Sequence, residues 1–369
     1  MNRKALSELT LAVGLVGPGA VGKALLEQLR VAIPKLEREG ISLEVRSILN
    51  SQQMLLAKNT PSIDLSNWDD EVIQKGTDPS LGVLTEHLKA SETPHRLIVD
   101  CTASSLIPKF YPKWMEQGIH VVTPNKKLNS GPYPAWRAVK TLQAAGAAHY
   151  MYEGTVGAGL PIISTLKTLL DTGDDILRIE GVLSGTLSYI FNTMKPGDRF
   201  SEVVWSAKRR GYTEPDARED LSGTDVTRKI ITLARECGAE LELSDVPTES
   251  LVPEPLRNLE DGGDLMTELA KFDDEWAARL REVDDAGEVL RYVGSYDAES
   301  GVCQVGPRRF SKSHPFAGLT STENIVSFTT SRYCNPSLIV RGPGAGPAIT
   351  AAGVFGDIIT LARYMGAHS

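Results

Sequence analysis

The chain has 369 residues, of which 41% are hydrophobic and 23% are charged, and its formal net charge at pH 7 is −8. This composition is that of an ordinary globular protein, and the length predicts about two domains. The negative charge and the lack of a dense Lys/Arg block argue against nucleic acid or an anionic membrane as a partner, and four widely spaced cysteines argue against a disulfide scaffold.

Residues 1–17 place two basic residues before an apolar stretch, as a signal peptide does, but polar residues interrupt the stretch and a Gly-rich turn ends it. We therefore expect a β-strand there rather than a signal peptide. No apolar stretch approaches the roughly 20 residues that cross a bilayer as a helix. These features predict a cytoplasmic protein without a membrane partner.

The first part of the chain alternates predicted strands and helices. Residues 10–16 (TLAVGLV) form an apolar run that ends at a Gly-rich turn, and apolar residues then recur at helical spacing. Further strand-like runs follow at residues 43–49, 96–101 and 119–122. This alternation predicts an α/β fold with a Rossmann-like, doubly wound parallel sheet.

A domain boundary is expected near residue 151, because a glycine-rich segment there interrupts the alternation. The acidic segment 245–286 is interpreted as a solvated helical excursion without chemistry. Four short runs then predict strands of a second sheet, and a helix is expected over residues 348–365. The four runs are residues 289–296, 302–310, 325–330 and 337–340.

Residues 17–22 (GPGAVG) fit the pattern G-x-G-x-x-G directly after a predicted strand and at the start of a predicted helix. Such glycines allow a tight turn, a close approach of a pyrophosphate and close helix–strand packing, and the helix N-terminus attracts the anion. The pattern alone also fits a plain structural turn, but its position favours a dinucleotide site.

The residues after the second predicted strand bear on the choice between NAD and NADP. An acidic residue usually holds the NAD ribose there, but this chain has residues 50–53 (NSQQ). Nothing in this stretch repels a 2′-phosphate, so NADP is favoured or at least accepted. Lys58 is a candidate partner of that phosphate, although a surface lysine is the simpler interpretation.

Two further segments could meet a cofactor. Residues 123–127 (TPNKK) follow a predicted strand at the ligand-bearing edge of the sheet, although spacing alone favours lysines that face solvent. Residues 341–346 (RGPGAG) open the last helix, whose free N–H groups point at whatever lies beyond them. The same helix is expected to pack back on the first domain.

A carboxylate-rich loop precedes a predicted helix that begins at an expected N-cap, Ser222, and ends at Gly238. Asp225 and Lys229 lie one turn apart on the same side of this helix, and spacing alone favours a capping box and a surface ion pair. The preceding carboxylates argue instead for an acidic pocket, which suits an ammonium-bearing substrate and a charged, proton-donating lysine. These carboxylates are Glu214, Asp216, Glu219 and Asp220.

Almost the whole chain resembles the homoserine dehydrogenases, especially the yeast-like enzymes and the dehydrogenase half of the plant bifunctional aspartokinase–homoserine dehydrogenases. Gly154 stands where the family would have Ala, and Pro18 lies inside the phosphate turn, but neither removes a functional side chain. The segments that carry the resemblance are VTPNKK, TVGAGLPIISTL, IEGVLSGTLSYIFN, GYTEPDAREDLSGTDVTRK, HPFAGL and RGPGAG.

The resemblance implies reversible reduction of L-aspartate 4-semialdehyde to L-homoserine in threonine, methionine and isoleucine biosynthesis, with NADP(H) favoured and NAD(H) as the alternative cofactor. The implied catalytic residues are Lys229, as proton donor, and Asp225. The implied substrate-binding residues are Glu214, Asp225, Asp220 and Lys126. The implied cofactor-binding residues are Gly17, Gly19, Ala20, Val21, Gly22, Thr102, Lys126, Gly211 and Gly346. The resemblance also implies a monovalent cation such as Na⁺ at Glu153, Val156, Ala158 and Leu160, held mostly by backbone carbonyls.

The resemblance also implies a homodimer and different functions for different parts of the chain. The expected parts are a dinucleotide-binding domain (1–151 plus 347–369) and an α+β catalytic and dimerisation domain (152–346), catalytic over about 162–290 and dimerising through strands at about 152–161 and 291–346. Cytoplasm is the expected compartment, or a plastid if a longer precursor carries a transit peptide. Feedback inhibition by threonine through an appended regulatory domain is not expected.

Two rival interpretations make different demands on the residues. A phosphorylating aspartate semialdehyde dehydrogenase needs a thiolate nucleophile, and Cys101 is the only cysteine at an expected sheet edge, where its neighbours look like the end of a strand. A catalytically inactive, cofactor-binding regulator predicts loss of Lys229, Asp225 or Glu214, and all three are present.

Overall fold

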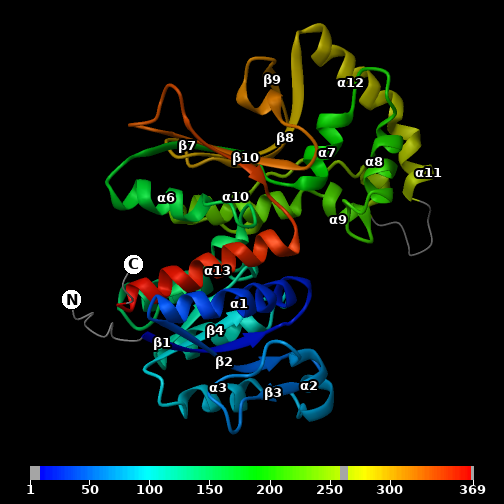
Figure 1. The fold of residues 1–369 in the computed structure, drawn as a ribbon. Helices are drawn as coiled ribbons and strands as arrows, with labels where there is room; N and C mark the ends of the chain where they lie inside the picture. The colour runs from blue at the N-terminus through cyan, green and yellow to red at the C-terminus, as the bar shows by residue number, and fades with distance from the viewer. Residues whose placement is uncertain (1–8, 258–264, 367–369) are drawn as a thin grey trace. The chain divides into compact units, whose positions relative to one another are not determined.

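The computed structural model describes residues 9–257 and 265–366. The chain forms two compact units (Figure 1): the first unit combines Met1–Gly159 with Gly346–Ser369, and the second unit is Leu160–Ala345. The sequence placed its boundaries at 151/152 and 346/347, and the functional roles it gave to the two parts stay predictions. The expected strand at about 152–161 is wrong, because residues 153–155 form a short helical turn and residues 156–161 form bends and turns. Among the described residues, every helix is too short or too polar to cross a membrane.

The first unit contains a six-stranded sheet with the strand order β3-β2-β1-β4-β5-β6. Its strands are parallel except for β3, which runs antiparallel to β2. The order reverses between β1 and β4, which is the switch point where such sheets bind ligands. The predicted doubly wound sheet is therefore confirmed, with β3 as an unpredicted addition. The strands are β1 (Leu9–Val16), β2 (Ile41–Leu49), β3 (Met54–Leu56), β4 (His95–Asp100), β5 (Ile119–Val122) and β6 (Tyr150–Met151).

Two long helices, α1 (Ala20–Arg38) and α13 (Pro347–Tyr364), share one hydrophobic core with the strands. Leu25 of α1 and Val354 of α13 are both fully buried in it, so the last helix packs on the first unit as expected (Figure 1). On β1, a Cβ at Gly14 would lie 2.9 Å from Leu88 Cδ1 of α3, so glycine lets this helix approach the sheet closely. The further helices of this unit are α2 (Trp68–Lys75), α3 (Leu81–Lys89), η1 (Ile107–Phe110), α4 (Tyr111–Glu116), α5 (Tyr133–Ala144) and η2 (Glu153–Thr155).

The second unit contains a five-stranded antiparallel sheet with the order β11-β10-β7-β8-β9. The four late strand-like runs all belong to this sheet, which confirms that prediction. Its strands are β7 (Ile176–Val182), β8 (Glu288–Asp297), β9 (Cys303–Ser311), β10 (Glu323–Thr330) and β11 (Leu338–Pro343). The helices beside it include α6 (Ile162–Asp171), α7 (Gly185–Thr193), α9 (Ala217–Leu221), α10 (Thr224–Glu236) and η6 (Pro315–Gly318).

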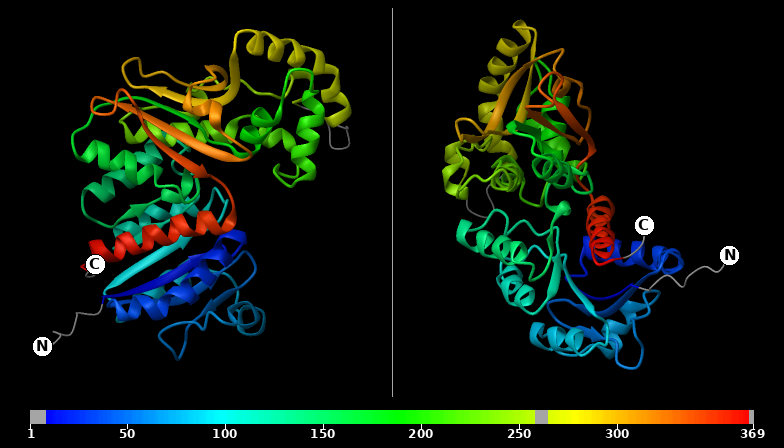
Figure 2. Two further views of the ribbon diagram at one scale, coloured as in Figure 1. Left: turned by 45° about the horizontal axis from the view of Figure 1, so that its top comes forward. Right: turned by 90° about the vertical axis from the view of Figure 1, so that its left-hand side faces the viewer.

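The acidic segment 245–286 is not simply solvated. Helices α8 (Phe200–Arg209), α11 (Leu265–Leu269) and α12 (Asp273–Asp285) gather at one end of the second unit (Figure 2). Trp276 of α12 is buried and stacks on Phe200 of α8 with ring centroids 4.6 Å apart. An apolar stripe within an acidic helix therefore packs against α8, while residues 258–264 lie outside the described part. The short helical turns here are η3 (Leu243–Asp245), η4 (Glu254–Leu256) and η5 (Ala270–Phe272).

Candidate functional site

The Gly-rich turn after β1 needs glycine at its two ends for different reasons. Gly17 has a φ of 86°, and a Cβ there would lie 2.6 Å from Thr102 Cγ2. A Cβ at Gly22 would overlap the carbonyl oxygen of Gly17. At Gly19, in contrast, a Cβ would meet no atom within 4 Å. The turn is thus tightly packed on its inner side and open at the glycine that would face a pyrophosphate.

Helix α1 begins directly after this open glycine. Gly19 is its N-cap residue, no side chain caps the helix, and its first turn contains no acidic residue. The first N–H groups of a helix have no partner within the helix and carry a partial positive charge. The turn therefore fits an anionic phosphate group, as the sequence pattern predicts.

The end of β2 does not bring a lysine toward the ribose position. Asn50 Oδ1 accepts hydrogen bonds from the backbone N–H groups of Gln52 (2.7 Å) and Gln53 (2.8 Å), which turns the chain into β3. Because β3 runs antiparallel to β2, Ala57 pairs with Arg46 and the backbone of Lys58 lies roughly 13 Å back from the end of β2. The simpler interpretation of Lys58 as a surface residue is therefore favoured.

Thr102 and Lys126 follow the neighbouring parallel strands β4 and β5, so both loops lie at the same carboxyl edge as the Gly-rich turn. Lys126 is half-buried, and its carbonyl oxygen accepts a hydrogen bond from the N–H of Ser130 at 3.0 Å. At the other end of the chain, Gly346 has a φ of 115° and is the N-cap residue of α13, again without a side-chain cap.

In the second unit, Lys229 is not the exposed partner of a surface ion pair. Its side chain is only 8% exposed, and Nζ lies 2.7 Å from Asp225 Oδ2 and 2.6 Å from the carbonyl oxygen of Leu183. Leu183 directly follows β7, so residues far apart in the sequence fix the ammonium together. The sequence alone favoured the surface interpretation because i, i+4 spacing contains no information about burial.

Helix α10 approaches the sheet closely and begins one residue later than expected. Gly223, with a φ of 75°, is its N-cap residue, whereas Ser222 ends α9 and makes no N-cap, so the predicted capping box is wrong. A Cβ at Gly223 would overlap the hydroxyl of Tyr292, which explains why the tight start needs glycine. Gly238 does end the helix, since its N–H donates to the Arg235 carbonyl.

The carboxylates before α10 divide into two groups. Asp216 caps α9 and forms an ion pair with Arg218 at 2.7 Å, which lowers the pKa of Asp216, so its role is structural. Asp220 is half-buried; burial raises its pKa, and the nearby charges of Glu214 and Asp225 raise it further. Glu214, Asp220 and Asp225 thus lie close enough for their charges to interact, while the predicted acidic pocket of Glu214, Asp216, Glu219 and Asp220 stays a prediction.

Sequence reasoning missed the segment that joins these carboxylates to Lys229. The hydroxyl of Thr186 donates to Asp220 Oδ1 at 2.9 Å, and the N–H of Glu214 donates to Asp220 Oδ2 at 2.8 Å. Thr186 lies in the first turn of α7, three residues after the carbonyl that holds Lys229. The matching segment IEGVLSGTLSYIFN contains both groups, but nothing in its pattern marks them individually.

Gly211 and one predicted cation ligand, Ala158, have positive φ angles. Gly211 has a φ of 72° and ends α8, its N–H donating to the Lys208 carbonyl at 3.0 Å, so its structural role is clear while cofactor contact stays a prediction. Ala158 has a positive φ of 57°, unusual for a residue with a side chain. Among the described residues no cluster of His, Cys, Asp or Glu could hold a metal ion. A cation at residues 153–160 would therefore depend on backbone carbonyls, which suit monovalent ions.

Comparison with known proteins agrees with this arrangement over nearly the whole chain. Residues 161–359 match the family model described as homoserine dehydrogenase, and residues 17–153 match that of the homoserine dehydrogenase NAD binding domain. The chain belongs to the homoserine dehydrogenase family. Members of this family are NAD(P)-dependent oxidoreductases, so the resemblance stated from the motifs is confirmed.

Relatives of this homoserine dehydrogenase family member include fused and single enzymes. The chloroplastic bifunctional aspartokinase/homoserine dehydrogenase 2 of Zea mays is 52% identical, and the alignment covers all of this chain but 40% of that protein. The homoserine dehydrogenase of Schizosaccharomyces pombe is 41% identical, with 96% of each chain covered. The chain thus spans about 40% of the plant relatives and nearly the full length of the fungal one.

Solved structures agree on the fold. A Candida auris protein described as of unknown function is 37% identical with a TM-score of 0.89, covering 96% of this chain and 98% of that one. A hyperthermophilic archaeal homoserine dehydrogenase mutant in complex with NADPH is 23% identical with a TM-score of 0.72, covering 98% and 100%. At that identity the archaeal likeness shows the fold alone.

Within this family framework, the rival thiolate interpretation loses its physical basis. Burial and the neighbouring Asp100 raise the pKa of the Cys101 thiol well above its usual range. A thiol in such surroundings is a poor nucleophile at neutral pH, because the thiolate is the reactive form.

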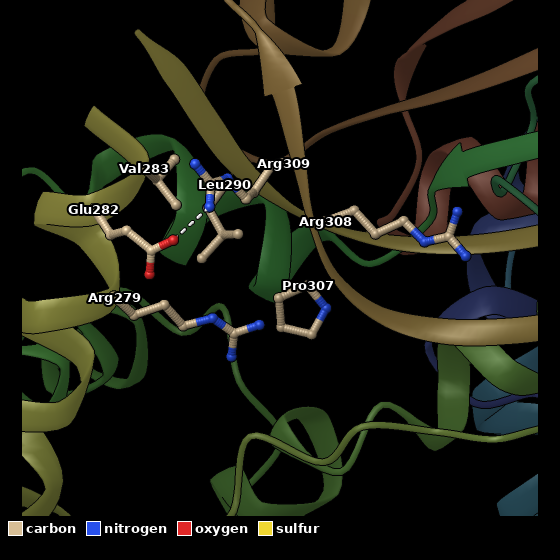
Figure 3. A pocket seen from close by; sticks show the side chains of 7 residues that line it. All are labelled: Arg279, Glu282, Val283, Leu290, Pro307, Arg308 and Arg309. Atoms are coloured by element: carbon tan, nitrogen blue, oxygen red, sulfur yellow. Dashed lines mark hydrogen bonds and ion pairs between the residues drawn. The ribbon is translucent and has the colours of Figure 1, made fainter. Parts of the chain in front are cut away.

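A cavity of about 370 Å³ in the second unit contains none of the expected homoserine dehydrogenase site residues (Figure 3). Arg309 pairs with Glu282 and Glu288, each at 2.6 Å, and Arg279 pairs with Glu249 at 2.8 Å. Neighbouring carboxylates compensate these guanidinium groups, so we assign the cavity no chemistry.

Proposed function

We propose that this chain is a homoserine dehydrogenase that reversibly reduces L-aspartate 4-semialdehyde to L-homoserine, in threonine, methionine and isoleucine biosynthesis. The observation that carries the proposal is the buried Lys229 ammonium, held between Asp225 and the Leu183 carbonyl, with the carboxylates of Asp220 and Glu214 near Asp225. Family membership supports the same reaction.

The proposed role of Lys229 is proton transfer. An ammonium has three N–H donors, and the contacts with Asp225 and Leu183 hold Nζ in one position. When bound, the nicotinamide supplies the hydride. Lys229 then gives its proton to the oxygen that becomes the homoserine hydroxyl, and in the reverse direction the lysine amine takes that proton back.

The proposed substrate contacts follow from charge. Glu214, Asp220 and Asp225 suit the α-ammonium group of an amino acid, because three neighbouring carboxylates favour a cation. Lys126, in the loop after β5, suits the substrate carboxylate or the nicotinamide amide. Positioning of the substrate lowers the entropy cost of reaching the reactive geometry.

The proposed cofactor is NADP(H), with NAD(H) as the alternative. Residues 50–53 contain no carboxylate that would repel a 2′-phosphate, and the amide of Asn50 already holds its own turn. The archaeal relatives solved with NADPH fit this proposal. The proposed contacts are Gly17, Gly19, Ala20, Val21, Gly22, Thr102, Lys126, Gly211 and Gly346.

We also propose a homodimer and a monovalent cation site. Leu177 of β7 and Ile339 of the edge strand β11 are exposed apolar residues, as expected of a surface that a second copy covers.

The proposed cation contacts are Glu153, Val156, Ala158 and Leu160. The proposed compartment is the cytoplasm, with a plastid as the alternative suggested by the chloroplastic plant relatives.

The test is homoserine-dependent reduction of NADP⁺ and NAD⁺ at alkaline pH, followed by nicotinamide absorbance, for the wild type and for Lys229→Ala. Loss of a positioned acid costs on the order of a hundred- to ten-thousand-fold in rate, so the variant should be folded and bind NADPH but be nearly inactive. A matched control is Lys312→Ala, which removes an exposed lysine paired with Asp284 at 3.2 Å and should keep wild-type activity.

Two outcomes would contradict the proposal. Wild-type turnover in Lys229→Ala would remove this lysine from the chemistry. A folded wild-type protein that binds NADPH but does not oxidise homoserine would favour the inactive regulator instead.

A further inference from the structure

A buried carboxylate lies at the carboxyl edge of the parallel sheet, next to the loops proposed to contact the cofactor (the cofactor edge). The mechanism proposed above does not use it. Asp100, the last residue of β4, is fully buried. Its Oδ2 accepts hydrogen bonds from Tyr111 Oη (2.5 Å) and Asn125 Nδ2 (3.0 Å), and its Oδ1 accepts one from the Thr102 N–H (2.8 Å). Burial raises the pKa of Asp100, while these donors lower it.

Two of the three donors to Asp100 come from the loops after β4 and β5, and the third, Tyr111, begins α4. Thr102 belongs to the loop after β4, and Asn125 to the loop after β5. Asn125 also donates to the Ser104 carbonyl at 2.9 Å, which ties the second loop to the first once more. Its Oδ1 accepts from the Lys127 N–H at 3.0 Å, so the same amide shapes the turn that contains Lys126.

Thr123 completes the connection from the backbone side. Its hydroxyl donates to the Asp100 carbonyl oxygen at 2.7 Å and accepts from the Asn125 N–H at 2.8 Å. One hydroxyl therefore joins the ends of two parallel strands and begins the turn of the second loop. Asp100, Thr123 and Asn125 form one network, which we call the loop clamp.

We propose that the loop clamp is a positioning device, which holds the Thr102 and Lys126 loops in one geometry for the nicotinamide end of the cofactor and the substrate. The inference rests on the proposed function. A buried carboxylate costs desolvation free energy, so three converging hydrogen bonds at an active-site edge indicate a selected geometry rather than simple core packing. Asp100 touches no reacting atom and acts only through the two loops.

The two ends of the clamp offer different substitutions. In Asp100→Asn, an amide NH₂ replaces one oxygen and faces either the Thr102 N–H or the Tyr111 and Asn125 donors, so at least one hydrogen bond is lost. Thr123→Val keeps the shape of the side chain but removes the hydroxyl, whereas Thr123→Ser keeps the hydroxyl. The valine and serine variants are therefore a matched pair.

The experiment measures NADPH dissociation constants by fluorescence, kcat and KM for homoserine, and thermal midpoints for the wild type and these variants. We expect Asp100→Asn and Thr123→Val to weaken NADPH binding and lower kcat/KM by on the order of 10- to 100-fold, with Thr123→Ser near the wild type. If Asp100→Asn does not fold, Tyr111→Phe takes its place. It removes one of the three donors to Asp100, so we expect a smaller loss of NADPH affinity and of kcat/KM.

The result that would overturn the inference is a lower thermal midpoint with NADPH affinity and kcat within twofold of the wild type, because that pattern belongs to a purely structural network. NADPH affinity tests the clamp even if homoserine is not turned over. An inactive wild type with clamp-dependent NADPH binding would thus reject the proposed reaction and keep the clamp.

Discussion

At the scale of single residues, burial decides what an ionisable group can do. Lys229 and Lys312 each pair with a carboxylate, but only Lys229 is buried and also bound to a carbonyl oxygen. Water screens the charges of the exposed pair, so this ion pair contributes little to stability. The buried Lys229 ammonium, in contrast, is held in one position. The same local chemistry thus gives a surface contact at one site and a candidate acid at the other.

His120 of β5 provides a residue-scale prediction on pH. Burial lowers its pKa to about 4, and its Nδ1 accepts a hydrogen bond from the His149 N–H at 3.0 Å. Because the unfolded chain binds a proton near the ordinary pKa of about 6.5, this group's contribution to stability is present above that pH and is lost as the pH falls toward 4. At pH 5 the loss should be about 2 kcal/mol relative to pH 7.

The measurement is the urea midpoint of the wild type and His120→Asn at pH 7 and pH 5. Asparagine keeps an acceptor near the Nδ1 position but does not titrate, so its midpoint should fall less on acidification. Equal shifts in the two proteins would show that other groups control acid stability.

At the scale of elements, glycines determine how closely α10 packs. A Cβ at Gly294 of β8 would lie 3.1 Å from both Val226 Cγ1 and Ile230 Cβ, so this helix rests almost on the strand. Gly223 has no side chain, so the start of the helix can lie against the hydroxyl of Tyr292. These close contacts set the position of Asp225 and Lys229 relative to the Leu183 carbonyl.

Gly223→Ala tests this positioning. The alanine would have to adopt a φ of 75°, and its Cβ would overlap the hydroxyl of Tyr292. We therefore expect a loss of about 2–4 kcal/mol in stability and a marked loss of activity. Gly238→Ala, at the other end of the same helix, has a φ of 92° and nothing within 4 Å, so about 1–2 kcal/mol and little change in activity are expected. Urea unfolding and initial rates would measure both, and equal effects at the two glycines would argue against a steric role of Tyr292.

At the scale of the whole molecule, the chain leaves the first unit at Gly159 and returns to it at Gly346. The segment before the first crossing packs tightly on α13, since a Cβ at Gly353 would lie 2.7 Å from the Ala158 carbonyl oxygen. The first unit is therefore completed only by the last helix, so we expect truncation before residue 347 to destroy its core.

The proposed homodimer is a prediction at this scale. Sedimentation equilibrium should give twice the mass of one chain at micromolar concentration, because exposed apolar residues at the sheet of the second unit need a cover. Ile339→Lys, on the exposed edge strand, should weaken association and leave the secondary structure unchanged. A wild type with the mass of one chain would contradict the dimer.

Local pattern was enough to predict most strands of both sheets and, in outline, the Gly-rich turn as a candidate phosphate site. Alternating runs predicted the parallel sheet, the Gly-rich turn predicted an anion site before α1, and the spacing of Val226, Ile230 and Leu233 predicted the buried face of α10. Each signal is local because it depends on backbone geometry over a few residues: a strand repeats every two residues, a helix every 3.6, and glycine alone tolerates a positive φ.

Only the tertiary structure decided which chemical groups meet. The Leu183 carbonyl reaches Lys229 across 46 positions, Thr123 meets Asp100 across 23, and the antiparallel course of β3 takes Lys58 away from the ribose edge. These contacts depend on strand order and on which helix packs on which face. Sequence periodicity shows which face of an element is buried but not which distant segment covers it, so burial of Lys229 and the loop clamp could be found only in the folded chain.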